Sequence, residues 1–135
     1  MADFPGYYFR VRDNGAVVFR VTSENRQRRI ELNEIALVNV KNGNVKAHGE
    51  VALTAADQAA IADWLAARVA LLAAREVDDI LRTVDHLNLT AQWAQTRAVE
   101  DQLDAVTEVL LLAMHDLRSV LVRKKSDRLL KETGE

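Results

Sequence analysis

The fold is decided by one stretch, VEDQLDAVTEVLLLAMHDLRSVLV at residues 99–122, in which apolar residues recur at alternating spacings of four and three. This spacing is typical of a helix that packs along one seam of a bundle. Other apolar residues lie beside and opposite the seam, so more than one neighbour must cover the helix. The seam consists of Val99, Leu103, Val106, Leu110, Ala113, Leu117 and Val120.

The helical period also extends upstream of this stretch and predicts a first long helix over residues 54–87. Thr54 is the expected N-cap, because its hydroxyl can accept a hydrogen bond from an unpaired backbone N–H. Asp57, three residues later, suits the positive end of the helix. Such a helix would be about 50 Å long, whereas a strand is roughly 20 Å long, so a small sheet cannot shield all of it.

We predict that the two helices separate at Asn88 and that Thr90 caps the second one, over residues 90–130. A further break within this second helix, near residues 97–98, is left open. Residues 131–135 are expected to form a frayed tail.

Two helical hairpins from two chains would cover all of these apolar faces as a four-helix bundle. We therefore predict a homodimer, with Leu111, Leu112 and Met114 in the dimer interface. The alternative is that the helices fold back on each other within one chain.

The N-terminal part, residues 5–49, predicts a four-stranded antiparallel meander, so the fold class is α+β. Residues 7–22 form the clearest hairpin, because apolar and polar residues alternate on both sides of Asn14-Gly15. A three-residue loop, residues 13–15, places Phe9 opposite Phe19 and keeps the apolar residues on one face. This register requires Gly15 in the left-handed conformation.

Further short strands are predicted over residues 28–32 and 35–41, followed by a two-residue turn at Asn42-Gly43. This turn places Val40 opposite Val45 and Val38 opposite Ala47.

The register of the first hairpin exposes an arginine-rich outer face. Tyrosine and arginine together offer stacking and phosphate-binding groups, so this face is our candidate nucleic-acid site. The candidate residues are Tyr8, Arg10, Arg12, Arg20, Arg26, Arg28 and Arg29.

Composition favours an ordinary cytoplasmic protein of one domain, residues 1–135. The chain has no cysteine, no signal-peptide pattern and no apolar run long enough to cross a membrane. Charge is uneven: residues 1–50 carry eight Lys/Arg and six Asp/Glu, and residues 51–122 carry five and eleven. Residues 123–135 carry five Lys/Arg and three Asp/Glu. The acidic middle argues against nucleic acid or anionic lipid as a partner of the helices.

One short segment, HDLRSVL at residues 115–121, resembles the H-box of sensor histidine kinases. The resemblance implies that His115 is a phosphoacceptor and that Asp116 assists it. The segment lacks the usual proline, which would stand at Val120, and no ATP-binding domain accompanies it.

No residue pattern indicates a catalytic site or a cofactor, and we predict no bound metal. Glu76, Asp79, Asp85 and His86 cluster along the first helix, which is typical of a solvated acidic face. The sequence thus favours a non-enzymatic dimeric interaction or regulatory protein that presents its sheet to a protein partner. A nucleic-acid-binding regulator and a histidine phosphotransfer protein are the alternatives.

Overall fold

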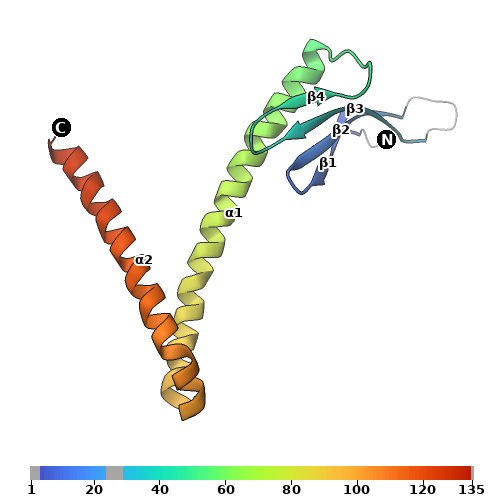
Figure 1. The fold of residues 1–135 in the computed structure, drawn as a ribbon. Helices are drawn as coiled ribbons and strands as arrows, with labels where there is room; N and C mark the ends of the chain where they lie inside the picture. Colours follow the sequence, from blue (N-terminus) through green and yellow to red (C-terminus); the bar gives the residue numbers. More distant parts are fainter. Residues whose placement is uncertain (1–3, 24–28, 135) are drawn as a thin grey trace. The chain divides into compact units, whose positions relative to one another are not determined.

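The computed structural model describes residues 4–23 and 29–134 and has an α+β fold, in which an antiparallel sheet precedes two long helices (Figure 1). This confirms the predicted fold class. The strands lie in the order β1-β2-β3-β4. Their bounds are Tyr7–Arg12 for β1, Gly15–Thr22 for β2, Glu31–Asn39 for β3 and Val45–Ala47 for β4. The helices are α1, Ala55–Thr96, and α2, Glu100–Gly134.

The chain divides into two compact units, one up to Ile80 and the other from Leu81. The first contains the sheet and the first part of α1. The second contains the rest of α1 and the whole of α2. Every described side chain that is fully buried belongs to the first unit.

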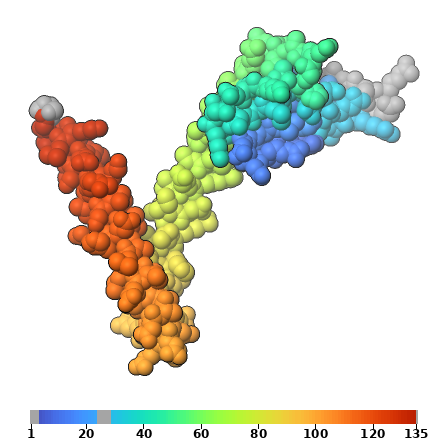
Figure 2. Space-filling view, viewed as in Figure 1, coloured from blue at the N-terminus to red at the C-terminus, as the bar shows by residue number. Residues whose placement is uncertain are grey.

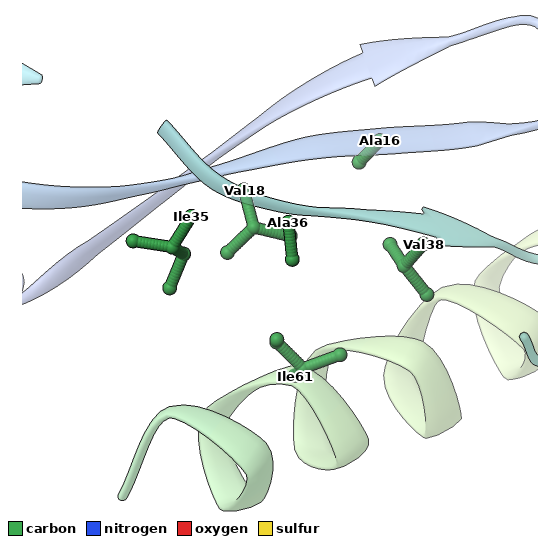
Figure 3. Close-up of a cluster of buried hydrophobic side chains, with 6 residues drawn as sticks. All are labelled: Ala16, Val18, Ile35, Ala36, Val38 and Ile61. Atoms are coloured by element: carbon green, nitrogen blue, oxygen red, sulfur yellow. The ribbon is translucent and has the colours of Figure 1, made fainter. Parts of the chain in front are cut away.

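The core of the first unit lies between the sheet and the first turns of α1. Ile61 points from α1 toward buried side chains of β2 and β3 (Figure 3). Beside this cluster, the rings of Phe9 and Trp64 stack at 4.8 Å between centroids and 4° between planes. In the space-filling view the strands cover this part of α1 (Figure 2).

The first hairpin has a different register from the one we predicted. Arg12 pairs with Gly15, so the loop contains only two residues, Asp13 and Asn14. Phe9 therefore lies opposite Val18 instead of Phe19. Because the difference is one residue, it reverses the relation between the faces of β1 and β2.

Gly15 is needed for a different reason from the predicted one. It does not have a positive φ; among the described glycines only Gly43 and Gly49 do. A Cβ atom at Gly15 would lie 1.8 Å from the carbonyl oxygen of Val38, in the neighbouring strand. Close approach of two backbones thus selects glycine here.

A β-bulge explains why β3 looked like two strands in the sequence. Val18 pairs with Ala36 and Phe19 pairs with Glu34, so Ile35 is an extra residue on β3. Ile35 and Ala36 are both buried although they are adjacent, which interrupts the alternation of apolar and polar residues.

The turn between β3 and β4 also differs from the prediction. Val38 pairs with Val45, and the connection contains five residues, 40–44. The Asn39 carboxamide oxygen accepts hydrogen bonds from the backbone N–H groups of Lys41 and Asn42, at 2.9 and 3.2 Å. Such asparagine hydrogen bonds stabilise a longer turn. The pairing of β3 with β4 is shifted by two residues from the predicted register, so each side chain stays on its predicted face of the sheet.

Helix α1 begins as predicted. The N–H of Asp57 donates to the hydroxyl of Thr54 at 3.0 Å, and the N–H of Thr54 donates to the carboxylate of Asp57 at 2.9 Å. This is a reciprocal capping box with aspartate in the place of glutamate.

The predicted break at Asn88 is wrong, because α1 continues to Thr96. The Thr90 hydroxyl donates to the carbonyl of His86 at 2.7 Å, a bond that threonine makes inside a helix. The two helices separate at residues 97–99, where we had left open a further break within the second helix. There the carbonyl of Trp93 accepts hydrogen bonds from Arg97 and Ala98, both at 3.0 Å.

Candidate functional site

A polar cluster under the sheet is centred on Asp57, which is 1% exposed. Arg20 from β2 forms a two-pronged ion pair with it, through Nη2 to Oδ2 and through Nε to Oδ1, the latter at 3.1 Å. The Tyr7 hydroxyl from β1 donates to Oδ1 at 2.7 Å. One carboxylate thus connects two strands to the first turn of α1.

The hydrogen bonds from Arg20, followed by those from Tyr7 and Thr54, hold the pKa of the Asp57 carboxyl far below its usual range although burial acts in the opposite direction. The hydrogen bond to Asp57 raises the pKa values of Tyr7 and Arg20. Each carboxylate oxygen of Asp57 accepts two hydrogen bonds, so both are saturated. This leaves no acceptor for a substrate, and the cluster serves to hold the fold together.

This cluster removes Arg20 from the outer face to which we had assigned it. The observed register places Arg20 opposite Tyr7, on the face that covers α1. Our predicted register was one residue out, and it placed Arg20 among the outward residues. Its function as the partner of Asp57 was therefore missed.

The outer face of the sheet carries Tyr8 and Arg10, as predicted, together with Phe19. The Arg10 guanidinium carbon lies 4.6 Å from the centroid of the Phe19 ring, a cation–π contact. The Tyr8 and Phe19 rings lie 6.1 Å apart. Phe19 is buried on the face of the sheet that points away from the first turns of α1, and Tyr8 and Arg10 of β1 lie against its ring.

The structure does not gather all seven candidate nucleic-acid residues on one face. Arg12 shares the outer face of β1 with Tyr8 and Arg10, and it lies opposite Gly15 at the hairpin end. Arg29 lies just before β3 and is exposed. Arg26 and Arg28 lie outside the described residues.

Beside Tyr8 the outer face has an open apolar depression of about 280 Å³. Ile30 and Leu32 are exposed there. We did not predict this depression, because the predicted register placed Val21 on the inner face of the sheet. The lining residues are Phe4, Pro5, Tyr8, Arg10, Val21, Ile30 and Leu32.

The second unit presents a different surface, because α2 contains no buried residue. The predicted interface residue Leu112 is 70% exposed, and Leu117 of the seam is 54% exposed. Other seam residues, Leu103, Val106 and Leu110, are half-buried. The large apolar side chains of α2 that are exposed are Val109, Leu111, Leu112, Met114, Leu117, Leu121, Val122, Leu129 and Leu130.

His115 is exposed on α2, and its backbone carbonyl accepts a hydrogen bond from the Ser119 hydroxyl at 3.0 Å. Its function as a phosphoacceptor stays a prediction. In the described part of the chain, no three His, Asp or Glu side chains lie close enough together to hold a metal ion.

No family model, curated protein or solved structure matches this chain. Over residues 4–23 and 29–134, neither helix is sufficiently long and apolar to cross a membrane.

Proposed function

We propose that this chain is a non-enzymatic, cytoplasmic interaction protein that works as a homodimer. Its helices form the dimer, and its sheet presents a surface to another protein. The observation that carries the proposal is the exposure of large apolar side chains along α2.

The magnitude of this exposure supports the proposal. Nine large apolar side chains of α2 are exposed, and together they present on the order of 900 Å². Burying half of the α2 surface against a second chain would contribute about 10 kcal/mol per chain before the entropic costs of association.

The exposed residues also lie on more than one side of α2. Leu111 and Leu112 lie away from the seam that contains Leu110, so one neighbouring helix cannot cover both surfaces. A bundle of four helices from two chains provides the additional neighbours. Leu111, Leu112 and Met114 are the residues that we assign to the dimer interface.

The outer face of the sheet is the surface that we assign to a protein partner. Tyrosine, phenylalanine and arginine are enriched at protein interfaces, and Tyr8, Phe19 and Arg10 pack together on this face. The adjoining apolar depression offers space for an anchoring side chain of the partner.

Sedimentation equilibrium at micromolar concentration tests the dimer. We expect the wild type to sediment as a dimer, and we expect a variant with Leu111→Lys and Leu112→Lys to sediment as a monomer. The matched control is Gln92→Lys with Gln95→Lys, which adds the same charge at exposed polar positions of α1. A monomeric wild type would refute the proposal.

The alternative functions make different predictions. A nucleic-acid-binding regulator should be retained on heparin in a salt-dependent manner, and Arg10→Ser with Arg12→Ser should remove that retention. Arg20 should stay intact in this experiment because it pairs with Asp57. A phosphotransfer protein should acquire acid-labile phosphate that is lost in His115→Gln.

A further inference from the structure

Charge is segregated along α2. Residues 100–117 carry five Asp/Glu and no Lys or Arg, whereas residues 118–134 carry six Lys/Arg and two Asp/Glu. We call residues 100–117 the acidic half and residues 118–134 the basic half.

The helix dipole does not account for this segregation. Its effect falls off within the first and last turns of a helix, where Glu100, Asp101 and Lys131 lie. Glu108 and Arg118 lie two or more turns from either end, yet each follows the charge sign of its half. The segregation therefore points to an external partner whose charges have the opposite order.

The apolar seam runs through the acidic half and enters the basic half. Val106 and Leu110 lie in the acidic half, and Val120 lies in the basic half. A partner helix that covers the seam must therefore lie beside both halves of α2. Whether this partner helix runs parallel or antiparallel to α2 decides which of its charges lie beside each half.

We infer that α2 pairs in an antiparallel orientation with α2 of a second copy. This inference rests on the proposed homodimer and adds the apolar seam of α2 to its interface, beside Leu111, Leu112 and Met114. A parallel pair would place acidic half on acidic half and basic half on basic half. An antiparallel pair is related by a two-fold axis, and it places each acidic half on the basic half of the other chain.

The part of α1 in the same unit is a poorer partner. Residues 81–96 contain one arginine and one aspartate, Arg82 and Asp85, and thus have no acidic or basic end. A second α2 matches the segregated charges along its whole length, which is about 50 Å.

Disulfide cross-linking of the full chain tests the orientation, because the sequence contains no cysteine that would interfere. In an antiparallel pair that places each acidic half on a basic half, Val106 faces Lys124 or, one heptad further along, Lys131. It then lies at least about 27 Å from its own copy, which is too far for a disulfide. Single-cysteine variants at these three positions are refolded in pairs and oxidised. Glu108→Cys, two residues from Val106 and away from the seam, is the matched control.

We expect Val106→Cys to cross-link with Lys124→Cys or Lys131→Cys at least ten times more than with itself, and we expect Glu108→Cys to cross-link with none of them. Rapid self-linking of Val106→Cys would indicate a parallel pair and overturn the inference. A dimeric wild type without any of these cross-links would also overturn it, while the proposed function would stand. A monomeric wild type would refute both.

Charge reversal provides a second test, in which two sets of substitutions each weaken the dimer and their combination restores it. Glu100→Lys, Asp104→Lys and Glu108→Lys change the net charge of the acidic half from −5 to +1, and Arg123→Glu, Lys125→Glu and Arg128→Glu change that of the basic half from +4 to −2. Each triple variant should raise the dimer Kd at least tenfold in low salt. A chain with all six changes should recover the wild-type Kd within a few-fold, because its halves are complementary again in an antiparallel pair. A Kd for the six-fold variant as high as that of the triple variants would overturn the inference.

Discussion

The side chain of Asp57 connects the start of α1 to the sheet. It closes the capping box of α1 with Thr54, and it receives Arg20 and Tyr7 from the sheet. Residues up to 50 positions apart in the sequence therefore depend on one carboxylate. Breaking a buried ion pair on one side leaves the other charge poorly compensated.

We predict that Asp57→Asn destabilises the chain by about 2–3 kcal/mol. The amide keeps the shape of the side chain and an oxygen for Thr54, but it removes the charge that Arg20 requires. Urea denaturation measures the loss. Asp63→Asn, at an exposed carboxylate of the same helix, is the control and should change the free energy of unfolding by less than about 0.5 kcal/mol. Equal stability of the two variants would contradict the proposed importance of the cluster.

The low pKa of Asp57 also predicts a pH dependence. Its carboxyl has a lower pKa in the folded chain than the value of about 3.9 expected in the unfolded chain. The stabilisation is therefore fully present above about pH 4 and is lost as the pH falls further. The difference in unfolding free energy between wild type and Asp57→Asn should shrink from pH 7 to pH 3. A constant difference over this range would show that the charge of Asp57 does not contribute.

Gly15 gives a prediction at a second single residue. We expect Gly15→Ala to lower the free energy of unfolding by about 3 kcal/mol, because the new methyl group would overlap the carbonyl oxygen of Val38. Gly6→Ala is the control, since nothing lies within 4 Å of the position of its Cβ. Thermal melting compares the two variants. Similar melting temperatures would contradict the close approach of β2 and β3.

Single residues also show which contacts could be predicted from the sequence and which could not. The capping pair of Thr54 and Asp57 was predictable, because the two residues are three positions apart and the signal is local. The pairing of Arg20 with Asp57 was not, since it depends on the register of the first hairpin. That register in turn depends on contact between Gly15 and another strand, which no local pattern reveals.

At the scale of elements, the change of hydrophobic period from two to about 3.6 residues was sufficient to predict a sheet followed by long helices. Two local irregularities caused the errors in the predicted bounds of the strands and helices. The bulge at Ile35 divided β3 into two apparent strands. Thr90 resembled an N-cap, but its hydroxyl bonds to the preceding turn of the same helix.

The helix boundary makes a testable prediction at this scale. Val99 precedes α2 without a side-chain acceptor, and only Gln102 bonds back to its N–H, at 3.1 Å. Val99→Asp should therefore stabilise the second unit by about 1 kcal/mol by supplying the missing N-cap acceptor. Thr90→Ala should change stability by less than about 0.5 kcal/mol, because Thr90 lies inside α1. Helical circular dichroism during thermal unfolding measures both variants. A large loss in Thr90→Ala without a gain in Val99→Asp would restore the boundary at Asn88.

For the whole molecule, the two units differ in how they are stabilised. The first unit has its own buried core around Val18, Ile35 and Ile61. The second unit has no fully buried side chain among its described residues. The sequence predicted that the helices need additional neighbours, because α2 is apolar on several sides. In the dimer that we propose, the second chain determines which helices meet and in which direction.

The two tryptophans allow the units to be observed separately. Trp64 lies in the first unit, stacked on Phe9, and Trp93 lies in the second, near the end of α1. Trp93→Phe therefore leaves a fluorescence signal from the first unit alone, and Trp64→Phe leaves one from the second.

Our last prediction is that the two signals respond differently to protein concentration. Dimer formation makes stability depend on concentration, and a tenfold increase adds about 1.4 kcal/mol. The midpoint reported by Trp93 should thus rise by about 5 °C for each tenfold increase in concentration. The midpoint reported by Trp64 should rise less, because the core of the first unit lies within one chain. In the Leu111→Lys, Leu112→Lys background the Trp93 midpoint should no longer depend on concentration. A Trp93 midpoint that is already independent of concentration in the otherwise wild-type chain would mean that α2 is stabilised without a second copy.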